Sequence, residues 1–94
     1  MKERIYLNNL YDIYGELLDS KKKEYFEMYY FDNLSLGEIA ELVDISRNAV
    51  HKRLKKTEEK LKYYEEVVGL YRKEQKIMSL IADEKLKEKI KELF

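Results

Sequence analysis

Two residue types that cross-link or interrupt small proteins are missing from this 94-residue chain, which has no cysteine and no proline. The absence of cysteine excludes a disulfide framework and any thiolate metal site. The absence of proline, together with only three glycines, leaves few positions that would break a helix. The composition therefore predicts an all-α protein with long, uninterrupted helices.

Long apolar runs are missing too, and no stretch approaches the roughly 20 residues that a membrane-spanning helix needs. Residues 1–10 contain charged side chains and no hydrophobic segment of the kind found in secretory signals. We therefore expect a cytoplasmic protein without a membrane span.

An excess of either charge is also lacking, because 19 Lys and Arg balance 19 Asp and Glu. A neutral chain has no bulk attraction to nucleic acid, so any such binding must use a local patch. Residues 46–56 provide one, with five cationic side chains and no acid. These side chains are Arg47, Lys52, Arg53, Lys55 and Lys56.

Apolar spacing predicts two helices in the first third of the chain. The first has the 3.6-residue period and is expected to end at Leu18 or Asp19. Asp19 or Ser20 can cap the second, because either side-chain oxygen can accept from amides of the first turn. The second helix contains a dense aromatic cluster and is expected to end in a turn at Asp32-Asn33.

Residues 35–56 have the pattern of a helix-turn-helix. Ser35 and Glu38 are spaced as a capping box at the start of a short helix. Ala40 is small enough for a second helix to cross there, and Asp44 tolerates the left-handed backbone that the turn requires. Ser46 can then cap the second helix of the motif.

That second helix is predicted to continue far beyond the motif. Its apolar positions from Val50 to Met78 are separated by steps of four and three, a pattern similar to a coiled-coil seam. Gly69 lies within this stripe and is expected to mark a bend. Asp83 can cap a last helix with an apolar face. This face consists of Leu86, Ile90, Leu93 and Phe94.

We divide the chain into a helix-turn-helix core domain, residues 1–66, and a C-terminal helical extension, residues 67–94, within one compact unit. The extension is expected to mediate dimerisation, because a helix this long would leave apolar side chains bare in a monomer. The predicted interface consists of Tyr63, Tyr64, Val67, Leu70 and Tyr71. The alternative is that the last helix folds back and covers these residues within one chain.

The second helix of the motif is the candidate nucleic-acid interface. If Val50 and Leu54 face the core, helical geometry turns Asn48, Lys52 and Lys55 outward, with Arg47 and His51 on one flank. Arginine can donate to guanine and asparagine can pair with adenine, whereas lysines suit phosphates. The predicted nucleic-acid-binding residues are Arg47, Asn48, His51, Lys52, Lys55 and Lys56. Two acids, Glu38 and Glu41, are unfavourable on the helix that would cross the phosphate backbone.

No residue pattern indicates catalysis, a cofactor or a metal. His51 is the only histidine and has no second histidine or cysteine with which to bind a transition metal. Glu58-Glu59 and Glu65-Glu66 lie beside lysines and are interpreted as solvated pairs. A glycine-rich phosphate loop is absent. We therefore predict a protein that is not an enzyme.

The segment SLGEIAELVDISRNAV at 35–50 resembles region 4 of bacterial sigma factors, and the whole chain resembles the YlxM family of small bacterial proteins. The likeness includes LYDIYGELL at 10–18 and KTEEKL at 56–61. It implies an all-helical fold, of the winged-helix type but without a wing, with a long helix after the recognition helix. Family members commonly have Gln at the position of Asn48 and Tyr at that of His51, so target specificity does not carry over.

The resemblance also implies a function, because genes of this family typically neighbour the gene for the signal recognition particle GTPase. The leading hypothesis is a dimeric DNA-binding regulator connected with that pathway. The second is an adaptor that uses the same basic helix on the particle's RNA or on its GTPase. A third is a sigma-factor relic that binds polymerase instead of promoter DNA.

Overall fold

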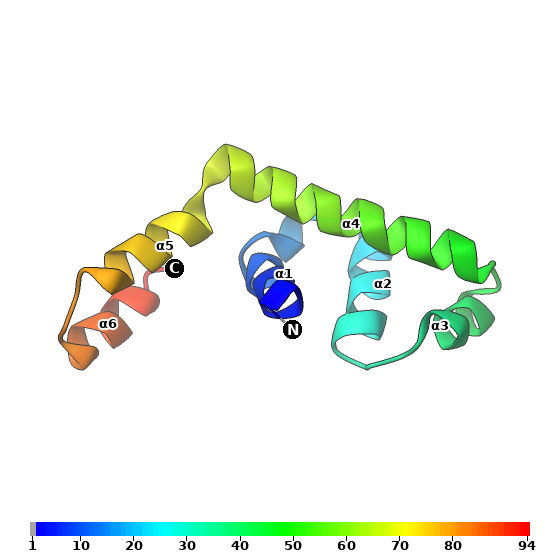
Figure 1. The fold of residues 1–94 in the computed structure, drawn as a ribbon, viewed down its shortest axis with the longest axis horizontal. Coiled ribbons are helices and arrows are strands. Elements are labelled where there is room, and N and C mark those ends of the chain that lie inside the picture. The colour runs from blue at the N-terminus through cyan, green and yellow to red at the C-terminus, as the bar shows by residue number, and fades with distance from the viewer. Residues whose placement is uncertain (1) are drawn as a thin grey trace.

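The computed structural model describes residues 2–94, and every regular element in this range is helical. The elements are α1 (Lys2–Tyr14), the 3₁₀ turn η1 (Gly15–Leu17), α2 (Ser20–Tyr30), α3 (Leu36–Val43), α4 (Arg47–Val68), α5 (Leu70–Ser79) and α6 (Glu84–Lys91). Helix α4 runs along one side of the molecule, with α1, α2 and α3 packed beneath it and the α5–α6 hairpin beyond its end (Figure 1). The all-α prediction is confirmed.

The helix boundaries follow the predicted caps. The Asp19 side chain accepts from the Lys22 amide at 2.8 Å and begins α2, and Ser35 and Glu38 form the complete capping box of α3. Asp44 has φ 55° and ψ 49°, the left-handed conformation expected in the turn. Ser46 accepts from the Ala49 amide and begins α4. The helix-turn-helix is thus built from local interactions that the sequence specifies.

The first helix ends earlier than predicted. Helix α1 stops at Tyr14, and the 3₁₀ turn η1 leads to an extended Leu18 that remains buried. The apolar period alone could not separate these two conformations, because Leu18 reaches the core from either.

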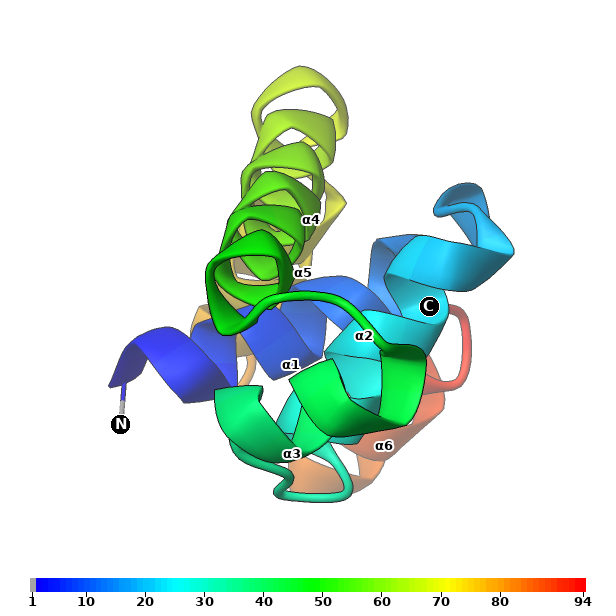
Figure 2. The ribbon, with the colours of Figure 1, turned by 90° about the vertical axis from the view of Figure 1, so that its right-hand side faces the viewer.

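Helix α4 lies above α1, α2 and α3 (Figure 2). This one long helix supports two apolar clusters. The first joins α1 and α2 to the middle of α4, and the second joins α2 and α3 to its start. Buried members of the first are Leu7, Leu10, Tyr14, Leu18, Phe26 and Leu61. Buried members of the second are Tyr25, Ile39, Val50 and Leu54. The core therefore holds α4 on one side only and leaves its opposite side exposed.

Helix α4 ends at Val68 and the chain turns at Gly69, so the expected bend at Gly69 is confirmed and the continuous seam from Val50 to Met78 is wrong. Gly69 has φ 69°, and α5 begins at the next residue. Buried Glu65 stabilises this joint by accepting from the amides of Tyr71 and Arg72, both at 3.0 Å, and from the Tyr14 hydroxyl at 2.7 Å. Glu65 is only 2% exposed, so its interpretation as a solvated residue is also corrected.

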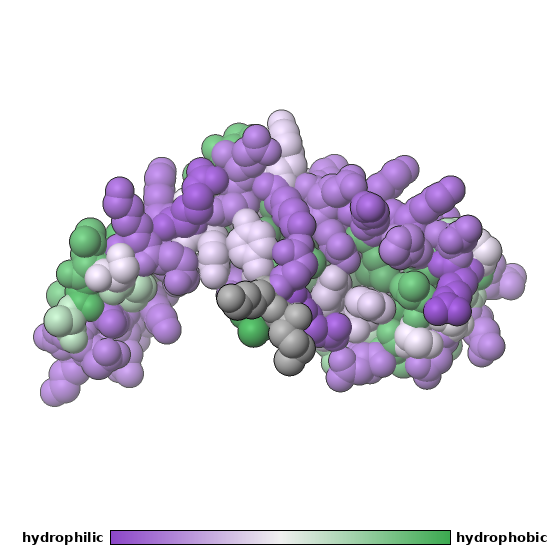
Figure 3. All heavy atoms as spheres, viewed as in Figure 1, coloured by the Kyte–Doolittle hydropathy of each residue, from purple (hydrophilic) through white to green (hydrophobic). Residues whose placement is uncertain are grey.

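The two C-terminal helices form a hairpin without a core of its own. Asp83 caps α6 as predicted, and α6 runs back beside α5 (Figure 1). Neither helix contains a buried residue. Apolar side chains gather at the outer end of the hairpin, where Figure 3 shows an apolar patch on a largely hydrophilic surface. Leu80 and Leu86 are exposed, and so are Leu93 and Phe94 at the C-terminus, where Phe94 lies beside Ile13 and Tyr71.

Candidate nucleic-acid interface

The orientation of α4 is set at its first turn. Ser46 and Asp44 fix where the helix begins, and Val50 and Leu54 are buried against α2 and α3. Consequently the six predicted nucleic-acid-binding residues are all exposed. Ala40, the predicted crossing position, packs against the same cluster as Val50.

The six residues do not lie on one face. Positions 51 and 56 are about 140° apart around a helix of 3.6 residues per turn. His51 and Lys55 line a concavity of about 250 Å³ beside Tyr29 and Tyr30. Lys56 lies on the other flank of α4, in a different concavity with Arg53. We call Arg47, Asn48, Lys52 and Lys55 the outward face, and this set itself spans about 140° of the helix. The position of His51 lies between those of Arg47 and Lys55, and His51 and Lys56 line the concavities on the two flanks.

The two acids of α3, Glu38 and Glu41, have different environments. Glu38 accepts from the Ser35 amide at 3.0 Å, and this hydrogen bond lowers the pKa of its carboxyl. Its charge is thus directed to the N-terminus of its own helix, where an anion is stabilising. Glu41 is simply exposed.

The predicted nucleic-acid-binding set leaves out three residues that the fold brings beside Lys56, namely Lys21, Lys22 and Arg53. Lys21 and Lys22, at the start of α2, line the same concavity as Arg53. A signal was present in the Lys21-Lys22-Lys23 run. The packing of α2 against α4 was needed to show that the run lies beside the recognition helix.

The predicted dimer interface separates into two groups. Tyr63 and Val67 are 60% and 65% exposed, whereas Tyr64, Leu70 and Tyr71 pack against the core of their own chain. Tyr71 contacts Tyr6 edge to face with ring centroids 5.5 Å apart. The five predicted interface residues therefore do not form a single exposed surface. Helix α6 lies beside α5 (Figure 1), and Tyr63 and Val67 remain exposed, so the last helix does not cover these two residues.

Two further features of residues 2–94 bear on function. They contain no group of three or more His, Cys, Asp or Glu side chains placed to hold a metal ion. None of the helices described in this range is both long and apolar enough to cross a bilayer.

Comparison with known proteins agrees with this architecture. Residues 1–93 match the UPF0122 family, described as "Putative helix-turn-helix protein, YlxM / p13 like". A UPF0122 protein of Caldanaerobacter subterraneus subsp. tengcongensis is 51% identical over 84 residues, which are 89% of this chain and 70% of the relative. One from Bacillus cereus is 48% identical over 86 residues, 92% of this chain and 76% of the relative.

A relative from Thermoanaerobacter sp. is 49% identical over 75 residues, 80% of this chain but 64% of the relative. The chain thus spans about two thirds of the length of such relatives. The family description names a helix-turn-helix and no enzymatic activity. With its full-length match and its helix-turn-helix on α3 and α4, the chain belongs to the UPF0122 family of YlxM- and p13-like proteins.

Proposed function

We propose that the protein is a DNA-binding regulator that acts in the cytoplasm and uses the outward face of α4. The observation that supports this most strongly is the placement of the basic segment. Residues 46–56 contain no acid and form the first half of the second helix of a helix-turn-helix, whose position is fixed by the Ser46 cap. Such a helix enters the major groove with its N-terminal residues on base edges.

Each side chain of the outward face has a chemistry suited to this role. Arg47 can donate two hydrogen bonds to guanine, and Asn48 can both donate to and accept from adenine. Lys52 and Lys55 suit phosphates, which give affinity without sequence information. Arg47 and Asn48 lie in the first turn of α4, the part of the helix that reaches deepest into a groove.

A second candidate is an adaptor that binds the RNA or the GTPase of the signal recognition particle. The observation in its favour is the zero net charge, which gives duplex DNA no long-range attraction beyond the local patch. Basic side chains on several sides of α4 also suit an RNA fold as well as a straight groove. The connection with this pathway rests on the family resemblance.

We also propose that the protein is a homodimer. Tyr63 and Val67 are one helical turn apart on the exposed side of α4, and Val68 is 50% exposed beside them. The hairpin adds further exposed apolar residues, among them Leu80 and Leu93, and contiguous exposed apolar side chains are typical of protein–protein contacts. In such a dimer the two Arg47 positions are expected one helical repeat apart, about 34 to 36 Å, and facing the same way.

The function is tested by binding at matched salt to three ligands: the DNA upstream of the chain's own gene, signal recognition particle RNA, and the GTPase. Arg47→Ala and Asn48→Ala should relax discrimination between DNA sites by about 1 to 3 kcal/mol for each base that is no longer recognised. Binding to RNA or GTPase without salt-sensitive binding to DNA would contradict the regulator and favour the adaptor.

The dimer is tested by light scattering, which should report twice the monomer mass. Tyr63→Asp with Val67→Asp should return the protein to 11.5 kDa, because a buried unpaired charge is costly in an apolar contact. A wild-type protein that remains 11.5 kDa at tens of micromolar would contradict the proposal.

A further inference from the structure

A cavity of about 400 Å³ lies between the start of α2 and the flank of α4. Its lining includes four cations, Lys21, Lys22, Arg53 and Lys56, and one carboxylate, Asp19. These side chains come from positions about 30 residues apart in sequence, so only the packing of α2 on α4 brings them together. We propose that this flank cavity binds a phosphate of the DNA backbone, beside the groove that the outward face occupies.

The guanidinium of Arg53 is held in position before any ligand arrives. Its Nη1 donates to the hydroxyl of Tyr25 at 2.7 Å, and its carbon atom lies 5.5 Å from the centre of the same ring. Tyr25 is itself buried, so the ring is a fixed support. A guanidinium has five N–H donors, and only one is used by this contact. The free donors can bind two phosphate oxygens with little further loss of side-chain freedom.

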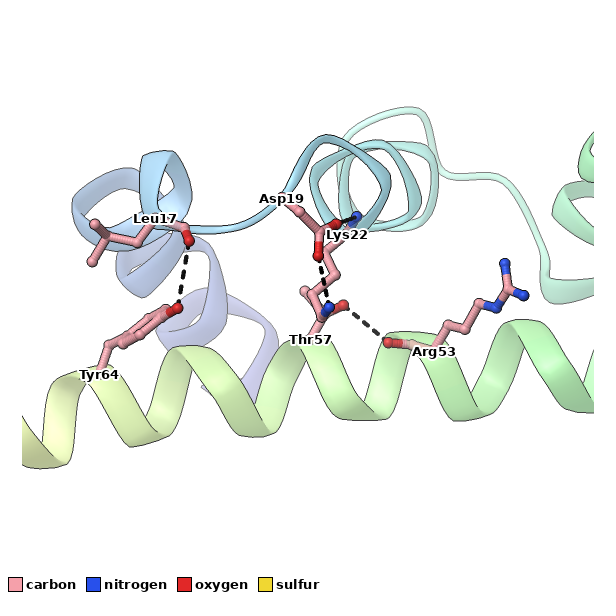
Figure 4. A network of polar contacts seen from close by, with 6 residues as sticks. All are labelled: Leu17, Asp19, Lys22, Arg53, Thr57 and Tyr64. Carbon is pink, nitrogen blue, oxygen red and sulfur yellow. Dashed lines mark hydrogen bonds and ion pairs between the residues drawn. The ribbon is translucent and has the colours of Figure 1, made fainter.

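The one carboxylate in the cavity is already neutralised. Asp19 forms an ion pair with Lys22 at 2.8 Å and accepts from the Lys22 amide (Figure 4). The hydrogen bonds from Lys22 lower the pKa of the Asp19 carboxyl, so it remains charged and paired. Within residues 2–94, no carboxylate lies within 4.0 Å of the charged nitrogens of Lys21, Arg53 or Lys56. Three uncompensated cations therefore face one small space, which favours a compact anion.

The position of the cavity indicates that the anion it binds is a phosphate of the DNA backbone. Lys56 follows Lys52 by four residues, so the cavity begins one helical turn beyond the outward face and on its flank. When a helix lies in a major groove, the phosphate strands run along its flanks. A DNA strand whose phosphates contact Lys52 would therefore next lie beside Lys56 and Arg53. This assignment rests on the proposed function, because it requires the outward face to enter a groove.

The test compares variants that remove the same charge from different places. Lys21→Gln with Lys56→Gln removes two exposed cations of the cavity. Lys85→Gln with Lys89→Gln removes two exposed cations of α6, far from it. Binding of the full chain to duplex DNA is measured from about 50 to 200 mM salt. The cavity variant should reduce the logarithmic salt slope by about 0.9 for each phosphate that is no longer neutralised, whereas the α6 variant should leave it unchanged.

Further variants separate this site from the base-reading face. Discrimination between DNA sites should stay as in wild type in the cavity variant, because phosphates carry no sequence information. Arg53→Lys should weaken binding although it keeps the charge, since an ammonium cannot reproduce the bidentate fork. Equal salt slopes for the cavity variant and wild type would overturn the proposal. A loss of binding confined to RNA duplexes would overturn its assignment to DNA.

If wild type binds no duplex, the proposed function has failed and the cavity is judged separately by NMR with inorganic phosphate. Localised shifts at the amides of residues 20–25 and at Arg53 Nε, abolished by Arg53→Gln, would support an anion site. Absence of those shifts would overturn it.

Discussion

The two ends of this small protein are built differently although both are helical and charged. The segment from α1 to α4 contains every buried side chain of residues 3–94, including one buried carboxylate, whereas α5 and α6 contain none. The α6 sequence has an apolar face as regular as those of the first helices, but the monomer gives that face no layer to pack on. Amphipathic sequence thus indicates that a helix has an apolar partner but does not say whether the partner is in the same chain.

The packed region also differs in how its tyrosines are used. The Tyr14 hydroxyl donates to Glu65 and the Tyr30 hydroxyl donates to Glu58, and the Tyr11–Glu27 pair is similar. Burial, followed by the hydrogen bond to Glu58, raises the pKa of Tyr30. These rings supply apolar area while their hydroxyls satisfy carboxylates. Within residues 2–94, the hydroxyl of Tyr71 on α5 makes no such contact with a carboxylate. The hairpin is attached through Glu65, which accepts from the amides of Tyr71 and Arg72, and through the packing of Leu70 and Tyr71 on the first cluster.

A matched pair of truncations tests whether the two regions differ in packing. Leu61→Ala should lower the free energy of unfolding by about 2 to 5 kcal/mol, because Leu61 is fully buried and its removal leaves a cavity. Leu86→Ala makes the same deletion on α6, where the side chain is 46% exposed, and should cost less than about 1 kcal/mol. Urea denaturation followed by circular dichroism measures both.

Equal destabilisation of the two variants would contradict this difference in packing. Equal decreases in the two variants would mean that the hairpin is packed as firmly as the first four helices, for example in a dimer. The division into residues 1–66 and 67–94 would then be wrong as a division of stability.

A single substitution can weaken the joint at Gly69 by removing hydrogen bonds that connect α1 to it. Tyr14→Phe removes a hydroxyl that donates to Glu65 and accepts from the Leu70 amide at 3.1 Å. Leaving these groups without a partner should cost about 1 to 3 kcal/mol. Amide hydrogen exchange should accelerate at Leu70 and Tyr71 before it does in α3. Tyr63→Phe, which removes an exposed ring's hydroxyl, is the control and should change neither quantity.

Features caused by interactions between residues close in sequence could be predicted, whereas features caused by contacts between distant residues could not. Ser35, Asp44 and Ser46 act within four residues of themselves, so the motif and its caps were predictable from the sequence. A bend at Gly69 was predicted as well, but the end of the helix there was not, because steps of four and three continue through it. Its cause is Glu65 reaching Tyr14, which is 51 residues away in sequence.

In the candidate site, too, contacts between residues distant in sequence could not be predicted. Exposure of Arg47, Asn48 and Lys52 followed from the period of α4 once Val50 and Leu54 were assigned to the core. The grouping of Lys56 with Lys21 did not, because it depends on where α2 lies against α4. Residues that one helix positions were predictable, and residues that two helices bring together were not.

Two glycine substitutions are expected to have smaller effects on stability, and of opposite sign. Gly69→Ala should destabilise the protein by about 1 to 2 kcal/mol, because its φ of 69° is unfavourable for a residue with a Cβ. Gly37→Ala should stabilise it by about 0.5 to 1 kcal/mol, since Gly37 is helical and a Cβ there meets only Ser35 Oγ at 3.8 Å. Melting temperatures should therefore move in opposite directions. A shift of the same sign would contradict the left-handed joint.

The most direct test of the central claim asks which region of the protein meets nucleic acid. Salt-dependent binding to duplex DNA is compared for wild type, for Lys52→Gln with Lys55→Gln on the outward face, and for Lys85→Gln with Lys89→Gln on the hairpin. We predict that the first pair flattens the salt slope by about 0.9 for each phosphate that is no longer neutralised and that the second leaves it unchanged. Equal slopes for all three proteins, or a flatter slope only in the hairpin variant, would contradict the assignment of α4 as the nucleic-acid interface.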